Sequence, residues 1–292
     1  MPDAPPELGT AERPRWDVQR GGGGPVLATA VHAGHAIGDE LRPFLAISEA
    51  DQRREEDPMT GIWSTVGDDA FRNYTSRFQC DLNRSRETAI YETPDDAWGL
   101  TVWDRQPPDA MKARSLAVWD RYYETMAGWI EGLIAEHGRV LVMDIHSYCH
   151  RRDGPDAAPA PQEDNPDIDL GVTTMDQDRF PGLLEAFEEA LRGMPVLGAQ
   201  GQRGEAGPMD VRRNVRYPDG GHWPEWVHAE YGDAVCTITL EYKKIFMDEW
   251  TGVADLGALE ALRAGLVRAT DAARAVLGAG GAPGAASAGA RA

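Results

Sequence analysis

The stretch RVLVMDIHSY, residues 139–148, limits the possible folds of this chain more than any other segment. Four of the five residues in 140–144 are large and apolar, and the run is short and rich in valine. Such a run is typical of a strand that is buried on both faces, between helices. It ends beside His146, and open α/β sheets bind ligands outside the carboxyl ends of their strands. We therefore expect a buried strand that delivers a histidine to a ligand site.

A second stretch, PVLATAVHAGH over residues 25–35, has the same design. An apolar strand ends here in His32, and small residues follow in a turn. Because the carboxyl ends of parallel strands meet at one edge of a sheet, we expect two imidazoles to approach each other there.

The charge balance argues against polyanionic partners. With a formal net charge of −19 over 292 residues, the chain offers no basic footprint for nucleic acid or for an anionic membrane surface. A small anionic substrate would need a local cluster of arginines. No apolar run reaches the length of a membrane span, and the N-terminal segment lacks a signal-peptide core, so we expect a cytoplasmic protein. The sequence does not indicate an oligomeric state.

Three cysteines, Cys80, Cys149 and Cys236, are odd in number and lie far apart without a CxxC pair. This pattern predicts neither a disulfide framework nor a thiolate zinc site, and we expect small buried hydrophobic residues instead. Cys149 and Ser147 lie near His146 and are alternatives as nucleophiles. The GxSxG elbow of serine hydrolases is absent.

Strand and helix patterns alternate along the chain, which predicts a single α/β domain with a mixed, mostly parallel sheet flanked by helices. Apolar residues at helical spacing predict a helix over 111–137, which Gly138 ends. We expect further helices within 43–63, stopping near Pro58, and over 180–192 and 256–277. Further strands are expected over 73–84, 168–174 and from 236 to 241, and polar loops over 150–166 and 211–223.

Both ends of the chain differ in composition from the middle. Residues 1–24 are polar, rich in proline and end in four glycines, which is typical of a disordered leader. Residues 278–292 are of low complexity, and we expect a disordered tail. The α/β domain is thus expected over residues 25–277.

Several expected element ends carry polar groups of different kinds: His32, the acids Glu55, Glu56 and Asp57, the group Arg77, Asn83 and Arg84, then His146 and Glu241. Two histidines and one carboxylate are the ligand set of catalytic zinc, which leaves a fourth position open. A glutamate outside that set can act as the base. Arginine and asparagine can bind a carboxylate through paired donors. The combination favours a metal-dependent hydrolase.

These blocks resemble the N-formylglutamate amidohydrolase family, whose fold is like that of the zinc carboxypeptidases. The resemblance runs from about Val26 to Gly252 and is carried by VHAGH, EEDPMTG, SRFQCDLNR, DIHSY, NPDIDLG and LEYKKIFMDEWTG. It implies a catalytic α/β hydrolase domain that cleaves N-formyl-L-glutamate or a related N-acyl amino acid with zinc-activated water. A zinc carboxypeptidase or another N-acyl amino acid deacylase is the alternative, and a catalytically silent binding protein is the third.

The resemblance also implies roles for individual residues. His32 and His146 would bind one Zn²⁺ ion, or another divalent ion, together with Asp57 or alternatively Glu56. Asn83 and Arg84 would hold the α-carboxylate of an anionic substrate, Arg77 would face its carbonyl oxygen or a second carboxylate, and Arg212 or Arg213 would add an anchor. Glu241 would be the general base and then the acid. Asp144 is expected to accept the second ring N–H of a ligating histidine, and Asp81 to orient Arg84 or its turn. His35 is expected in a supporting or surface role outside the ligand set, and the alternative is that it is itself a metal ligand.

Overall fold

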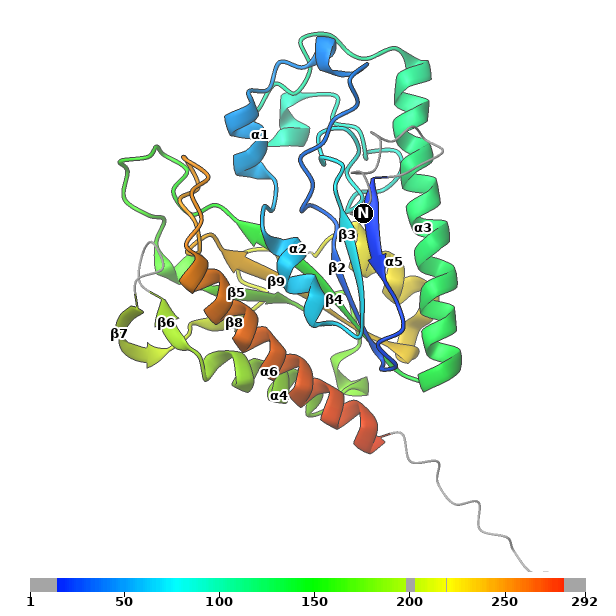
Figure 1. Ribbon diagram of the computed structural model, residues 1–292, viewed down its shortest axis with the longest axis vertical. Coiled ribbons are helices and arrows are strands. Elements are labelled where there is room, and N and C mark those ends of the chain that lie inside the picture. Colours follow the sequence, from blue (N-terminus) through cyan, green and yellow to red (C-terminus); the bar gives the residue numbers. More distant parts are fainter. Residues whose placement is uncertain (1–14, 198–202, 219, 281–292) are drawn as a thin grey trace, which may run out of the picture.

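A computed structural model describes residues 15–197, 203–218 and 220–280 (Figure 1). Seven strands form one mixed sheet in the order β1-β3-β2-β4-β9-β5-β8, and β6 and β7 pair separately. The strands are β1 (Trp16–Gln19), β2 (Val26–Ala30), β3 (Asp69–Asn73), β4 (Val140–Tyr148), β5 (Ile168–Gly171), β6 (Pro195–Leu197), β7 (Arg203–Pro208), β8 (Val211–Arg213) and β9 (Val235–Lys243). The helices are α1 (Glu49–Glu55), α2 (Thr60–Trp63), α3 (Asp109–His137), α4 (Leu183–Arg192), α5 (His222–Tyr231) and α6 (Leu256–Gly280). The predicted α/β fold with a mixed sheet is confirmed.

The four central strands, β3, β2, β4 and β9, run parallel to one another. β1 runs antiparallel to β3, and β5 runs antiparallel to β9 but parallel to β8. Every residue of β4 is buried. Its side chains alternate between two cores: Leu141, Met143 and Ile145 face one, and Val140 and Val142 face the other. The strand predicted to be central, β4, is therefore the middle strand of the sheet and lies between the two hydrophobic cores.

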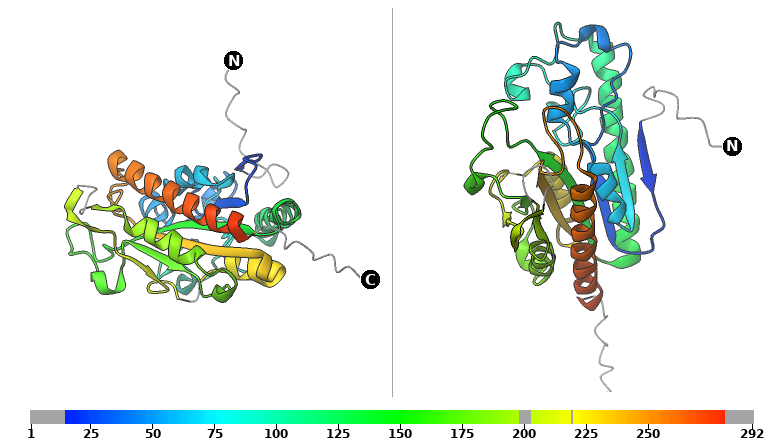
Figure 2. Two further views of the ribbon diagram at one scale, coloured as in Figure 1. Left: turned by 90° about the horizontal axis from the view of Figure 1, so that it is seen from below. Right: turned by 60° about the vertical axis from the view of Figure 1, so that its left-hand side comes forward.

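Helices cover both faces of the sheet. α4 and α6 lie side by side over the face that holds Met143, while α3 and α5 cover the opposite face (Figures 1 and 2). α3 ends at Gly138, whose φ of 75° is the left-handed conformation that glycine adopts readily at a helix end. Among the described residues, no helix is both long and apolar enough to cross a membrane. All three cysteines are buried and free, as expected.

The expected disordered leader is wrong for part of its length. Residues 16–19 form β1, which pairs antiparallel with β3 at the edge of the sheet. Trp16 anchors this strand, because its ring packs 5.5 Å from that of Phe71. A strand of four residues with three exposed side chains carries too little pattern to be recognised. At the other end, α6 continues to Gly280, beyond the expected boundary at residue 277; residues 1–14 and 281–292 lie outside the described part of the chain.

Three other boundaries also differ from expectation. β3 ends at Asn73, so the strand expected over 73–84 lies upstream, because the Asn73 amide binds the carbonyls of Val31 and Thr75 and turns the chain. The helix expected within 43–63 is divided into α1 and α2, with an extended Glu56 and a left-handed Met59 between them. The loop expected over 211–223 contains β8 and the start of α5.

Candidate metal centre and active site

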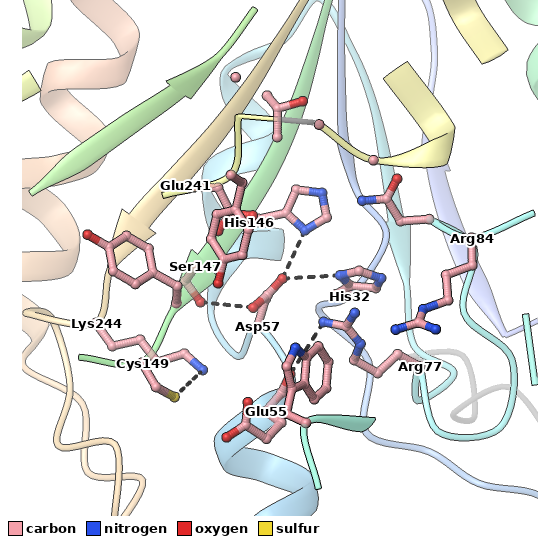
Figure 3. A pocket seen from close by; sticks show the side chains of 18 of the residues that line it. His32, Glu55, Asp57, Arg77, Arg84, His146, Ser147, Cys149, Glu241 and Lys244 are labelled. Carbon is pink, nitrogen blue, oxygen red and sulfur yellow. Dashed lines mark hydrogen bonds and ion pairs between the residues drawn. The ribbon is translucent and has the colours of Figure 1, made fainter. Parts of the chain in front are cut away.

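Parallel strands bring the two histidines to the same edge of the sheet. His32 lies two residues after β2, and His146 lies in β4, which pairs with β2. The two ring centroids are 4.8 Å apart, and both side chains are almost fully buried. The neighbouring strand β9 places Glu241 directly opposite His146 in the ladder. The backbone therefore assembles these three groups without help from a long loop (Figure 3).

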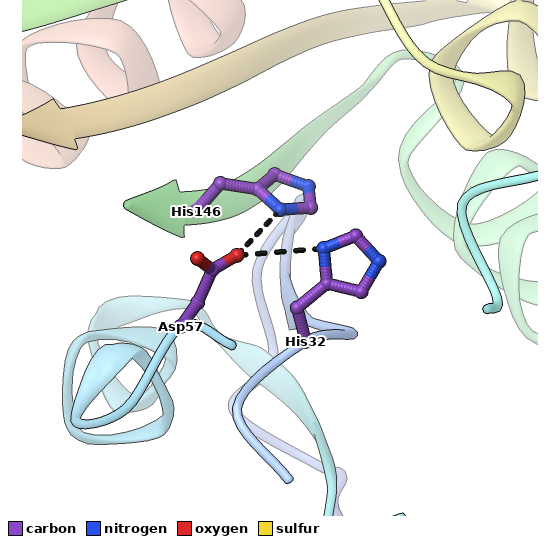
Figure 4. Close-up of side chains that lie close together, drawn as sticks. All are labelled: His32, Asp57 and His146. Atoms are coloured by element: carbon purple, nitrogen blue, oxygen red, sulfur yellow. Dashed lines mark hydrogen bonds and ion pairs between the residues drawn. The ribbon is translucent and has the colours of Figure 1, made fainter. Parts of the chain in front are cut away.

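Asp57 joins the two histidines from the turn between α1 and α2. Its backbone N–H donates to the carbonyl of His32 at 3.0 Å, and Ser147 Oγ donates to its Oδ1 at 3.2 Å. Asp57 Oδ2 lies 3.0 Å from His146 Nδ1 and 3.4 Å from His32 Nδ1 (Figure 4). One potential ligand atom from each residue lies within 4.8 Å of the others.

The remaining ring nitrogens are held by buried carboxylates. His32 Nε2 lies 2.7 Å from Asp81 Oδ1, and His146 Nε2 lies 2.7 Å from Asp144 Oδ2. Asp144 reaches His146 because the two residues are two apart on one strand and so share a face. Such carboxylates orient metal-binding histidines and fix the tautomer that leaves the other nitrogen free. Asp144 thus lies where it was expected, and Asp81 holds its own turn through the N–H of Asn83 but also contacts His32, which was not foreseen.

This group fits a divalent cation. His32 Nδ1 is buried and has no hydrogen-bond partner within the described part of the chain, which is costly for a polar atom unless something else binds it. Burial opposes ionisation of Asp57, but the hydrogen bond from His146 and the close approach of His32 hold the pKa of that carboxyl well below its usual range. Two imidazole nitrogens and a charged carboxylate are a donor set that zinc commonly uses. His32, Asp57 and His146 are therefore the residues that could hold a metal.

Glu241 lies beside this group and takes no part in it. Burial is the main cause that raises the pKa of Glu241, to about 8, and the carboxylates of Asp57, Asp144 and Asp169 act in the same direction while His146 opposes them. A carboxyl group that titrates near neutral pH can both accept and return a proton.

Three further residues of the expected site line the same cavity, which has a volume of about 230 Å³. Arg77 is held by Asp81 Oδ2 at 2.9 Å and by the Tyr91 hydroxyl, and it lies over the ring of Trp98. Arg84 donates to the carbonyl of Asp96 at 2.6 Å.

Asn83 caps α5, since its Oδ1 accepts the N–H of Trp223 at 2.9 Å. This bond uses the amide oxygen and leaves Nδ2 as a donor for an anion. Gly221 allows this close approach, because a Cβ there would lie 2.4 Å from the Asn83 side chain.

Glu56, the alternative acidic ligand, points away from the two histidines. Its carboxylate accepts a hydrogen bond from Ser76 Oγ at 2.5 Å and lies 2.6 Å from His35 Nδ1. Adjacent residues in extended backbone direct their side chains to opposite sides, so Asp57 faces the cavity and Glu56 does not. His35 is accordingly a partner of Glu56 and lies outside the ligand group, as expected.

Arg212 is another expected site residue that the structure does not bring to the cavity. Its guanidinium donates to Asp210 and to the carbonyls of Gln162 and Glu163, at the outer end of the sheet on β8. Arg213 likewise pairs with Glu188, at 2.8 Å. The expectation that Arg212 or Arg213 anchors the substrate is therefore wrong, because local acceptors bind both guanidinium groups away from the cavity.

The sequence did not point to several other cavity residues: Trp98, Arg152, Tyr217 and Gly220 from loops, Thr239 from β9 and Lys244 directly after it. Tyr217 illustrates the reason. Its loop is fixed by the buried Asp169, whose carboxylate accepts the backbone N–H groups of Val215, Arg216 and Tyr217 at 2.7–3.1 Å. An aspartate inside the apolar strand IDLG was the available signal for such a fixed loop.

Comparison with known proteins identifies the family. The family model described as N-formylglutamate amidohydrolase matches residues 24–246. The structure of N-formylglutamate amidohydrolase from Ralstonia eutropha JMP134 is similar, with a TM-score of 0.67 and 18% identity over 90% of this chain and 98% of that chain. A gene product from Agrobacterium tumefaciens has a TM-score of 0.60 and 20% identity over 92% and 97% of the two chains. These two structures show a shared fold, and no curated protein matches significantly in sequence. Because the family match spans most of its length, the chain belongs to the N-formylglutamate amidohydrolase family.

Proposed function

We propose that this protein is a zinc-dependent amidohydrolase that cleaves N-formyl-L-glutamate or a closely related N-acyl amino acid. The observation that carries the proposal is the buried group of His32, Asp57 and His146 beside Glu241, in which His32 Nδ1 has no hydrogen bond to any residue that the structure describes. Family membership supports the amidohydrolase activity. The donor set supports zinc, because imidazole and carboxylate are its usual ligands.

The chain's own residues divide the work as follows. His32 and His146 would hold the ion through Nδ1, and Asp57 through its carboxylate. A divalent ion in such a set supplies Lewis-acid activation of water and of the amide carbonyl. Glu241 accepts a proton from the attacking water while the water oxygen bonds to the amide carbon. The C–N bond then breaks, its electron pair stays on nitrogen, and Glu241 returns the proton to that nitrogen.

Arg77, Asn83 and Arg84, which line one part of the cavity, would orient the substrate. Arg84 and the Asn83 amide would bind the α-carboxylate, since both offer donors for an anion. Arg77 would stabilise the carbonyl oxygen as it gains negative charge. Arg77 suits this role because Asp81, Tyr91 and Trp98 hold its guanidinium in place.

The first experiment measures metal content and hydrolysis together. The purified protein should hold about one zinc per chain, lose activity on N-formyl-L-glutamate when a chelator removes the ion, and regain activity when zinc is returned. A panel of formyl, acetyl and peptide substrates would separate this activity from that of another deacylase or a carboxypeptidase. A protein that binds zinc and hydrolyses nothing in the panel would be a binding protein, and the proposal would be wrong.

A further inference from the structure

The cations around the cavity differ in how firmly they are held. Arg77, Arg84, Arg152 and Lys244 line it. Lys244 Nζ is committed to the carbonyls of Arg54 and Glu56, at 2.5 and 2.7 Å. Arg77 and Arg84 also make short hydrogen bonds within the protein. Arg77 donates to Tyr91 and Asp81 at 2.9 Å, and Arg84 donates to the carbonyl of Asp96 at 2.6 Å.

Arg152 is the loosely held cation of this set. It lies in the polar segment after β4, and its side chain is 34% exposed. Within the described part of the chain its hydrogen bonds go only to Glu55, with lengths of 3.3 and 3.4 Å. Bonds of this length between charged groups are weak compared with the usual 2.7–2.9 Å.

Glu55 has a second and closer partner. Arg54 donates to its Oε1 at 2.9 Å, and the Arg54 guanidinium is itself fixed 4.2 Å above the ring of Trp250. If Arg152 binds another anion, the buried Glu55 carboxylate remains paired with the guanidinium of Arg54. Removing Arg152 from Glu55 therefore does not leave an unpaired buried charge, which is the usual penalty for breaking such a pair.

The charges in this cluster leave room for one more anion. Two guanidinium groups face one carboxylate, so Arg54, Arg152 and Glu55 together carry one net positive charge. The cluster belongs to the end of α1 and to the segment after β4, whereas Arg84 comes from the loop after β3. Two separate elements thus bring cationic groups to one cavity.

We propose that Arg152 is the specificity-determining residue that binds the side-chain carboxylate of the substrate, and that Glu55 holds Arg152 until the substrate arrives. The inference rests on the proposed function and narrows its substrate class to N-acyl amino acids with an acidic side chain. Arg152 takes the place of the second anchor that Arg212 cannot supply. Arginine suits the role because its planar fork matches a carboxylate.

The test compares N-formyl-L-glutamate with N-formyl-L-glutamine, whose side chain has the same shape without the charge. The zinc-loaded wild type should prefer the glutamate compound in kcat/KM, and Arg152→Gln should lose roughly 10- to 100-fold on that compound alone. Arg152→Lys should recover part of the loss. Arg151→Gln is the matched control, since this neighbouring arginine binds the carbonyl of Pro155 and does not line the cavity.

A second variant, at Glu55, should strengthen the binding of N-formyl-L-glutamate instead of weakening it. Glu55→Gln removes the anion that competes for Arg152, so KM for N-formyl-L-glutamate should fall while KM for the glutamine compound stays the same. A purely structural role for the pair would raise both KM values or lower the melting temperature without changing the preference. An unchanged preference in Arg152→Gln would overturn the inference and leave the hydrolase intact.

Binding measurements keep this inference separate from the proposed function. Calorimetry with L-glutamate and L-glutamine should show weaker L-glutamate binding to Arg152→Gln than to the wild type. If that difference appears in a protein that hydrolyses no N-formyl substrate, only the proposed function fails. If it is absent from such a protein, the role of Arg152 fails as well.

Discussion

His146 and Glu241 occupy the same register position on the adjacent parallel strands β4 and β9. Neighbouring strands lie about 4.8 Å apart, so the backbone ladder fixes how far the candidate base stands from the candidate metal ligand. His146 is buried, whereas Glu241 is the one residue of β9 that is only partly buried, and both side chains line the cavity. A proton acceptor at a set position beside an activated water is what amide hydrolysis needs.

Replacing Glu241 by glutamine tests its role as base. Glutamine keeps the shape of the side chain but cannot take up a proton, so kcat should fall by roughly 10²- to 10⁴-fold. Zinc content and KM should stay close to the wild-type values, because Glu241 lies outside the group of His32, Asp57 and His146. Steady-state kinetics with metal analysis of the same preparation checks both. A variant with near-normal kcat would remove Glu241 from the mechanism.

The acidic ligand can be identified with a pair of neighbouring variants. Asp57→Asn should abolish tight zinc binding, since Asp57 alone of the two acids lies near both imidazoles. Glu56→Gln should retain about one zinc per chain, because Glu56 binds Ser76 and His35 instead. Metal analysis after dialysis, with circular dichroism to verify folding, measures the outcome. Loss of zinc in Glu56→Gln and its retention in Asp57→Asn would reverse the assignment.

The part of the site that strands supply could be predicted from the sequence. His32, His146 and Glu241 each follow or end an apolar run, and the carboxyl ends of parallel strands must meet. The choice between Asp57 and Glu56 could not be made from the sequence. It depends on the backbone of one turn, where Glu56 is extended and Met59 is left-handed.

Residues from loops escaped prediction because tertiary contacts place them. Arg152 itself was not singled out as a site residue, since the polar composition of its segment predicts an exposed loop and does not distinguish one side chain in it from another. Arg212 was a wrong candidate for the opposite reason: its charge suggested anion binding, but Asp210 and two carbonyls already occupy its donors. β1 was missed since its support comes from Phe71 and Tyr122, distant in sequence from Trp16.

His35 should titrate above its ordinary range. The hydrogen bond to Glu56 raises the pKa of His35, and its partial burial opposes the shift. Because the folded pKa is raised, the contribution of this pair to stability is complete below about pH 6.5 and is lost as the pH rises through the folded value. NMR titration should show the His35 pKa falling in Glu56→Gln. An identical titration curve in that variant would mean that Glu56 does not hold the imidazole.

Variants of the buried neighbours Lys243 and Lys244 can distinguish an effect on protein stability from an effect on metal binding. Lys244 Nζ donates to the carbonyls of Arg54 and Glu56, directly before Asp57, whereas Lys243 Nζ binds Asp167 at 2.7 Å and the carbonyl of Asn165 at 2.9 Å. Either lysine replaced by methionine leaves buried acceptors unsatisfied, so each variant should lose roughly 2–5 kcal/mol of unfolding free energy in urea.

Only one of the two variants should also bind zinc more weakly. Lys244→Met frees the backbone that positions Asp57, and its zinc dissociation constant should rise by about 10- to 100-fold, as for other residues that orient metal ligands. Lys243→Met is the matched control, because it holds residues 162–167 and leaves the Asp57 turn untouched. Competition with a chromophoric chelator measures both constants. Equal constants in the two variants would show that the Asp57 turn keeps its geometry without Lys244.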